Sequence, residues 1–102
     1  MKIQIGDERT STWGGYEADF SVVLDGGGHT LKGIAYTGPH AQSSYQARAK
    51  SLTYPSGHVS GWVRGLTSTG RPQHSRNRLR NAVSNLAKIV QRRMDLGVGV
   101  GA

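Results

Sequence analysis

The residues between Pro72 and Gly97 contain neither glycine nor proline, although the chain has 15 glycines among its 102 residues. Proline is favoured in the first turn of a helix and glycine just after the last one, so we expect a helix from Pro72 to Leu96. Its apolar residues recur at steps of three and four, which predicts an amphipathic helix with one face turned to a core. They are Leu79, Val83, Leu86, Val90 and Met94, with Ala82, Ala87 and Ile89 widening the stripe.

The part of the chain that precedes the helix is divided by glycines into short alternating segments. Met1–Ile5 alternates as a short strand, and residues 6–16 have the composition of a loop. Ala18–Leu24 and His29–Thr37 alternate on either side of Asp25-Gly26-Gly27-Gly28. Because glycines supply the positive φ angles of a tight turn, this pattern predicts a β-hairpin.

Residues 44–54 fit both a helical and a strand spacing of their apolar side chains. The turn signal Tyr54-Pro55-Ser56-Gly57-His58 and the β-rich segment after it favour the strand. We therefore expect a second hairpin, 44–54 with 58–66, in which Gly61 and Gly65 are candidates for bulges. Residues 66–71 are expected to be a linker.

These segments predict an α+β fold, in which an antiparallel β-sheet of four to five strands (two hairpins) packs against one long C-terminal α-helix. We expect a single domain over residues 1–96 and a flexible Gly/Val tail over residues 97–102. The order of elements differs from the double-stranded RNA-binding pattern, which places a helix before its strands. It also lacks the second short helix of a helix-turn-helix.

Charge is distributed very unevenly along the chain. Residues 1–40 hold three Lys or Arg against five Asp or Glu, a net charge of −2, whereas residues 41–102 hold ten against one, a net charge of +9. Ordinary surfaces intersperse the two signs. Five acids can neutralise at most half of the ten cations, so the second half of the chain predicts a negatively charged partner.

The expected helix concentrates this excess. Its polar face carries side chains that donate hydrogen bonds to phosphates and base edges, and its N-terminal turns carry cations against the helix dipole. This arrangement is typical of an anion site, although Arg also has a high helix propensity and contributes to solubility. The candidate contacts are Arg71, Arg76, Asn77, Arg78, Arg80, Asn81, Asn85, Lys88 and Arg92, extended by Arg48, Lys50 and Arg64 of the second hairpin.

Candidates for other chemistry are few. Cysteine is absent, and His29, His40, His58 and His74 have no metal-ligand spacing, so we expect neither a metal site nor a cofactor. A metal-independent ribonuclease would need a base and an acid beside the cations, for which the chain offers His40, His58 and Glu17. Trp13, Tyr16 and Trp62 are candidate aromatic anchors that could stack a base or hold a protein partner.

The sequence thus favours a small basic, non-enzymatic nucleic-acid-binding protein that uses the polar face of its C-terminal helix on DNA or RNA. The alternative is a protein-binding modulator or inhibitor, such as those of phage or mobile elements, which docks its basic helix on an acidic or nucleic-acid-binding surface of a host complex. A ribonuclease comes third. We expect a cytoplasmic protein without a membrane segment, and the wide apolar face of the helix leaves room for a homodimer.

Overall fold

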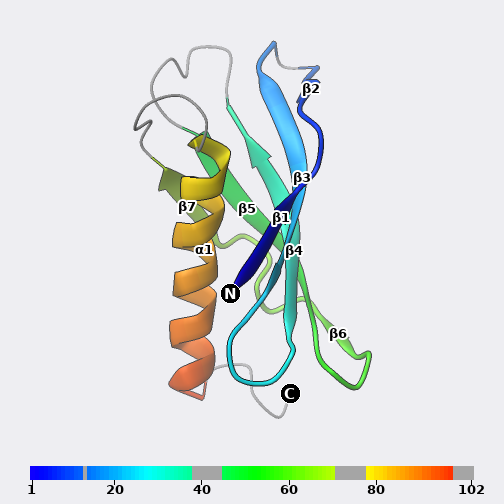
Figure 1. Cartoon of the computed structure of the whole chain (residues 1–102), viewed down its shortest axis with the longest axis vertical. Coiled ribbons are helices and arrows are strands. Elements are labelled where there is room, and N and C mark those ends of the chain that lie inside the picture. Colours follow the sequence, from blue (N-terminus) through cyan, green and yellow to red (C-terminus); the bar gives the residue numbers. More distant parts are fainter. Residues whose placement is uncertain (13, 38–44, 71–77, 98–102) are drawn as a thin grey trace.

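The computed structural model describes residues 1–12, 14–37, 45–70 and 78–97. In this part of the chain, seven strands form one antiparallel sheet and a long C-terminal helix packs across one of its faces, which is the predicted α+β fold (Figure 1). The strands are β1 (Lys2–Ile5), β2 (Arg9–Thr10), β3 (Tyr16–Val23), β4 (Thr30–Tyr36), β5 (Tyr45–Thr53), β6 (Val59–Ser60) and β7 (Thr67–Gly70), and the helix is α1 (Arg78–Asp95).

The sheet is five strands wide, because each of its edges is shared by two short strands. β3, β4 and β5 lie side by side in the centre. β1 and β2 both pair with β3 at one edge, and β6 and β7 both pair with β5 at the other. Each edge therefore has a gap in its strand pairing, at the point where one short strand ends and the next begins.

The first predicted hairpin is confirmed. β3 and β4 pair antiparallel from Glu17 and Tyr36 to Val23 and Thr30. The hairpin closes with a hydrogen bond from the backbone nitrogen of Leu24 to the oxygen of His29, at 2.8 Å. In the turn between Leu24 and His29, Gly26, Gly27 and Gly28 all have positive φ angles, which residues with a side chain rarely adopt.

The second hairpin differs from the prediction. β5 and β6 do form a hairpin around the 54–58 turn, but β6 ends after two residues. Residues 61–66 then turn, and residues 67–70, which we expected to be a linker, return as β7 beside β5. The segment Thr67–Gly70 has no apolar alternation that would predict a strand, and its place in the sheet depends on pairing with a distant partner.

A β-bulge lies in β5 rather than at Gly61 or Gly65. Gly33 of β4 pairs with Ala49 and Lys32 pairs with Ser51, so Lys50 has no partner on β4. In a regular strand, residues three positions apart lie on opposite faces. Ala49 and Leu52 are nevertheless both buried on the core face, because the unpaired residue Lys50 lies between them. Lys50 and Ser51 consequently stand beside each other without either entering the core.

The core lies between α1 and the face of the sheet that it covers. Leu31 and Leu52 of the sheet and Val83, Leu86 and Val90 of the helix are completely buried. Burial of each such side chain stabilises the fold by about 1.5–3 kcal/mol. The helix ends at Asp95, one residue before the predicted Leu96, and Gly97 beyond it has a φ of 86° and donates its backbone N–H to the oxygen of Met94.

The helix approaches the sheet most closely at Gly70, the last residue of β7. A Cβ atom at Gly70 would overlap the backbone nitrogen of Ala82 and lie 2.9 Å from its Cα atom. Glycine is required here because two backbones meet without room for a side chain. The start of α1 is thereby fixed against one edge of the sheet, and no helix of the described ranges covers the opposite face.

Candidate functional site

All six acidic residues lie in the part of the chain that the structure describes, and the ion pairs that they form with other described residues stay within the first half of the sequence. Arg9 lies 3.4 Å from a carboxylate oxygen of Glu17 and 3.3 Å from one of Asp19. The N-terminal ammonium lies 2.7 Å from Asp25. The hydrogen bond that the Arg9 guanidinium donates to the carboxylate of Asp19 is the main cause that raises the pKa of Arg9.

The described cations of the second half are not paired with acids of the described residues. Within the described ranges, no carboxylate lies within 4.0 Å of a Lys or Arg that follows residue 40. Asp95, the acid of this half, instead accepts a hydrogen bond from Gln91 at 3.2 Å. Internal pairing of the two halves therefore accounts for none of the described cations of β5, of the 61–66 turn or of α1.

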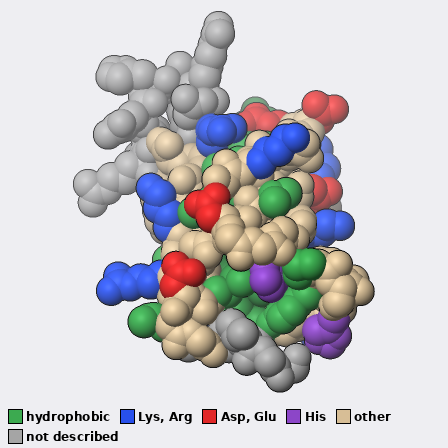
Figure 2. Space-filling view, turned by 60° about the horizontal axis from the view of Figure 1, so that its bottom comes forward, with side chains coloured by type: hydrophobic (Ala, Val, Ile, Leu, Met, Phe, Trp, Pro, Cys, Tyr) green, Lys and Arg blue, Asp and Glu red, His purple; other side chains and the backbone are tan. Residues whose placement is uncertain are grey.

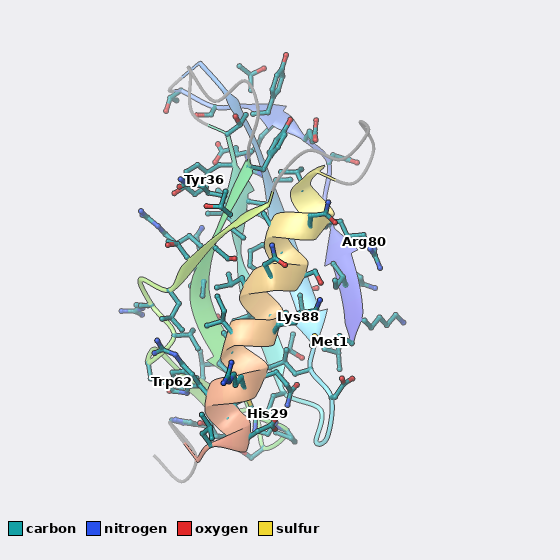
Figure 3. All side chains as sticks on the ribbon, turned by 90° about the vertical axis from the view of Figure 1, so that its left-hand side faces the viewer. Met1, His29, Tyr36, Trp62, Arg80 and Lys88 are labelled. Carbon is teal, nitrogen blue, oxygen red and sulfur yellow. The ribbon has the colours of Figure 1, made fainter. Side chains whose placement is uncertain are left out.

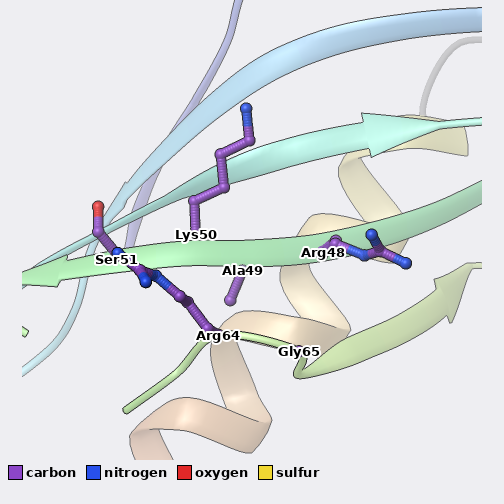
Figure 4. Close-up of a pocket in the computed structure, with 6 residues that line it drawn as sticks. All are labelled: Arg48, Ala49, Lys50, Ser51, Arg64 and Gly65. Carbon is purple, nitrogen blue, oxygen red and sulfur yellow. The ribbon is translucent and has the colours of Figure 1, made fainter. Parts of the chain in front are cut away.

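Three of these cations surround one hollow at the edge of the sheet. The hollow has a volume of about 530 Å³. It opens where the pairing of β5 passes from β7 to β6, so residues 49–51 lie opposite the 61–66 turn instead of a strand. Figure 4 shows Lys50 and Ala49 pointing to opposite sides of β5, and Arg64 reaching from the turn toward Ser51. The residues that line the hollow are Arg48, Ala49, Lys50, Ser51, Arg64 and Gly65.

The local backbone explains why these cations meet. The backbone nitrogen of Ala49 donates to the oxygen of Leu66 at 3.0 Å, which holds the turn against β5. Gly65 adopts a φ of 85°, and Arg64 donates its backbone N–H to the oxygen of Gly61. On β5, alternation exposes Arg48 and the bulge exposes Lys50. The hollow is thus formed where the 61–66 turn faces the bulge of β5. We call it the basic hollow, after Arg48, Lys50 and Arg64 in its lining.

The helix carries a second group of cations, on the other side of the molecule. Arg80, Lys88, Arg92 and Arg93 are exposed and have no carboxylate partner among the described residues. Figure 3 shows Arg80 near the start of α1 and Lys88 near its middle. Because α1 covers the face of the sheet opposite to Lys50, a single rigid ligand cannot lie flat on both groups.

Two polar residues of the predicted helix face are used inside the molecule. Asn85 donates from Nδ2 to the backbone oxygen of Thr69 at 3.0 Å. Gln91 accepts at Oε1 from the backbone nitrogen of Asp25 at 2.9 Å. Asn81 is half-buried. The polar stripe that the sequence places on one free face is therefore partly turned toward neighbouring strands and loops.

Of the cations predicted near the start of the helix, Arg78 is the first residue of α1. The remaining candidates at the N-terminal end of the helix and in the first loop lie outside the described residues, namely Arg71, Arg76, Asn77 and Trp13, as do His40 and His74.

The other two aromatic candidates differ in exposure. Tyr16 is 53% exposed at the start of β3. Trp62 is half-buried and packs against the core cluster, which does not suit a free anchor. At the same end of the sheet the ring of Tyr54 contacts His29 edge-on at 4.8 Å and His58 at 5.6 Å. Figure 2 shows hydrophobic side chains gathered around a histidine at this end of the molecule.

The candidate ribonuclease residues that can be placed do not come together. Glu17 pairs with Tyr36 at one end of the β3–β4 hairpin, and Arg9 occupies its carboxylate. His58 lies in the turn beyond Thr53, which pairs with Thr30 at the other end. The six residue-to-residue steps from Thr30 to Tyr36 correspond to about 20 Å of strand. No group of three metal-ligating side chains occurs in the described part of the chain.

Sequence reasoning identified Arg48, Lys50 and Arg64 as an extension of the helix surface but not as a cluster around a hollow. It also overlooked Ser51, which the bulge brings to the same site, and Tyr36, which lies beneath Arg48. The signal for the bulge was the interval of three between Ala49 and Leu52, where a regular strand has two.

In the described part of the chain, no helix is both long and apolar enough to cross a membrane. Comparison of the chain with protein-family models, with curated proteins and with solved structures found no match.

Proposed function

We propose that this protein binds nucleic acid through phosphate contacts centred on the basic hollow. The observation that carries the proposal is that Arg48, Lys50 and Arg64 line one open hollow with no carboxylate among its lining residues. Like charges held close together repel one another, so a cluster of this kind is stabilised by an anion placed between them.

The side chains of the hollow suit a phosphodiester. Each guanidinium presents a planar set of donors that can bind two phosphate oxygens at once, and the ammonium of Lys50 adds a point charge. The hydroxyl of Ser51 offers a further donor beside them. A carboxylate of an acidic protein would also fit one guanidinium, but a phosphodiester backbone supplies regularly repeated charges to the wider basic surface.

The cations of α1 form a separate surface, which supports weaker contacts to the same or to a second strand. The helix remains part of the proposal because Lys88 and Arg92 are exposed and unpaired among the described residues. The centre of the interface nevertheless moves from the helix to the sheet edge, since Arg48, Lys50 and Arg64 share one concave site there.

The proposal is tested by fluorescence anisotropy with labelled DNA and RNA at about 50 mM salt, where phosphate contacts are strong. Two triple variants remove the same charge from the two surfaces: Arg48→Ala/Lys50→Ala/Arg64→Ala and Arg80→Ala/Lys88→Ala/Arg92→Ala. We expect the first to weaken binding at least about tenfold and the second to weaken it less. A larger loss in the helix variant would move the interface to α1, and absence of binding by the unaltered chain would refute the proposal.

A further inference from the structure

The face of the sheet opposite to α1 is not covered by any helix or strand of the described residues. The side chains on this open face are those that alternate with the core residues of β3, β4 and β5. Lys32, Gln46, Arg48 and Lys50 on it are exposed, and Ile34 and Tyr36 are half-buried. The basic hollow lies at the β5 edge of this same face.

Tyr36, the last residue of β4, is held at one end of the open face by its neighbours. Its hydroxyl donates to Oε1 of Gln46 at 2.9 Å, on the residue that pairs with it across β4 and β5. The guanidinium carbon of Arg48 lies 6.0 Å from the centre of its ring. The hydroxyl of Tyr36 thus has a hydrogen-bond partner and the ring is held in place. A ligand that stacks on the ring therefore loses less free energy to the ordering of this side chain.

Arg48 connects this ring to the basic hollow, because the same side chain lines the hollow and lies over Tyr36. A fixed aromatic ring beside a cation cluster is the arrangement that binds single strands: the cations hold the backbone and the ring stacks a base. In a duplex the base faces are covered by their neighbours, so an aromatic side chain on a flat sheet finds nothing to stack on.

The positions of the charges on the open face are compatible with a phosphate at the β5 edge and a base on Tyr36. The cations lie on β4, β5 and the adjoining turn, while the acids of the face, Glu17 and Asp19, lie on β3 and are paired with Arg9. From β4 to β5 is about 4.8 Å and from β3 to β5 about 10 Å. A nucleotide whose phosphate is at the β5 edge therefore reaches Tyr36 with its base without crossing the acidic strand.

We infer that the open face of the sheet binds single-stranded nucleic acid, with a phosphodiester in the basic hollow and the adjoining base stacked on Tyr36. The inference rests on the proposed function and specifies the state of the strand that occupies the same site.

The test compares single strands of about 12 nucleotides, long enough to cover the face, with duplexes of the same sequence. Tyr36→Leu is expected to weaken single-strand binding by about 5- to 100-fold and to leave duplex binding nearly unaffected. Tyr36→Phe retains a ring and is expected to restore most of the preference. Tyr54→Leu, the same substitution at a tyrosine beyond the other end of β4, where its ring contacts His29 and His58, is the matched control.

The outcomes separate the inference from the proposed function. A preference for single strands that disappears in Tyr36→Leu and persists in Tyr36→Phe and Tyr54→Leu supports the inference. Equal or tighter duplex binding, still lost on removal of the three cations, overturns the inference alone. Absence of all binding overturns both. If Tyr36→Leu does not fold, Tyr36→Val, with a higher strand propensity, takes its place with the same expected result.

Discussion

The side chain of Asn85 donates a hydrogen bond from Nδ2 to the backbone oxygen of Thr69, 3.0 Å away, and so joins the second turn of α1 to β7. The two residues lie close to the point where Gly70 brings the strand against Ala82. This contact fixes the helix relative to the sheet edge on which the basic hollow opens.

We expect Asn85→Ala to lower the free energy of unfolding by about 1 kcal/mol, because the hydrogen bond to Thr69 is lost. Lys88→Ala, an exposed position on the same helix, is the control and should change stability by less than about 0.5 kcal/mol. Urea denaturation followed by circular dichroism measures both. Equal effects of the two substitutions would show that the Asn85 contact does not stabilise the fold.

Gly33→Ala should destabilise the protein strongly. A Cβ atom at Gly33 would overlap the backbone oxygen of Arg48 and lie 2.6 Å from Cζ of Phe20, and neither the strand backbone nor the buried ring can move freely. We expect a loss of about 3 kcal/mol or more.

Gly6→Ala is the matched control for Gly33, since the nearest atom to its Cβ would be the oxygen of Asp19 at an ordinary 3.5 Å. Thermal unfolding of both variants measures the difference. A Gly33→Ala protein as stable as Gly6→Ala would mean that β4 and β5 are less tightly packed than described.

The affinity for single strands should depend on salt to an extent set by the number of phosphate contacts. Three contacts in the basic hollow predict that log affinity falls with log salt at a slope of about −2 from this site. Arg64→Ala should make the slope less steep by about 0.7. Titration at several salt concentrations measures the slopes, and an unchanged slope in Arg64→Ala would exclude this residue from phosphate contact.

The bulge predicts opposite results for two single-residue deletions in β5. Deletion of Lys50 removes the unpaired residue and leaves Ala49 and Leu52 on the core side of a regular strand, so the protein should fold and bind weakly. Deletion of Arg48 instead turns a polar residue toward the core and should unfold the protein. Circular dichroism and anisotropy together test this pair, and two equally stable deletions would contradict the register described.

Local patterns were sufficient for the elements whose hydrophobic faces are continuous in sequence. The apolar stripe of α1, the glycine turn at 26–28 and the alternation of Phe20 and Val22 each specify a periodicity that the core then uses. These predictions succeeded because the buried face of a helix or strand requires apolar residues, and their spacing is visible in the sequence.

Pairing over long distances could not be deduced in the same way. β7 is a strand because Thr67–Gly70 pairs with β5, and nothing in these four residues predicts β5 as the partner. The basic hollow requires Arg64 to approach β5 across a turn whose shape depends on Gly65 and on a hydrogen bond from Ala49. The uneven charge could be read from the sequence, whereas the cluster that it forms depends on topology.

The bulge at Lys50 also bears on how such a surface arises. Because Lys50 has no partner on β4, a single codon separates a plain strand from one that presents a charged protrusion beside Arg48. A lineage could acquire or discard the anion site by inserting or deleting that codon while every core contact of Ala49 and Leu52 is inherited unchanged. The scaffold and its binding surface can therefore evolve at different rates.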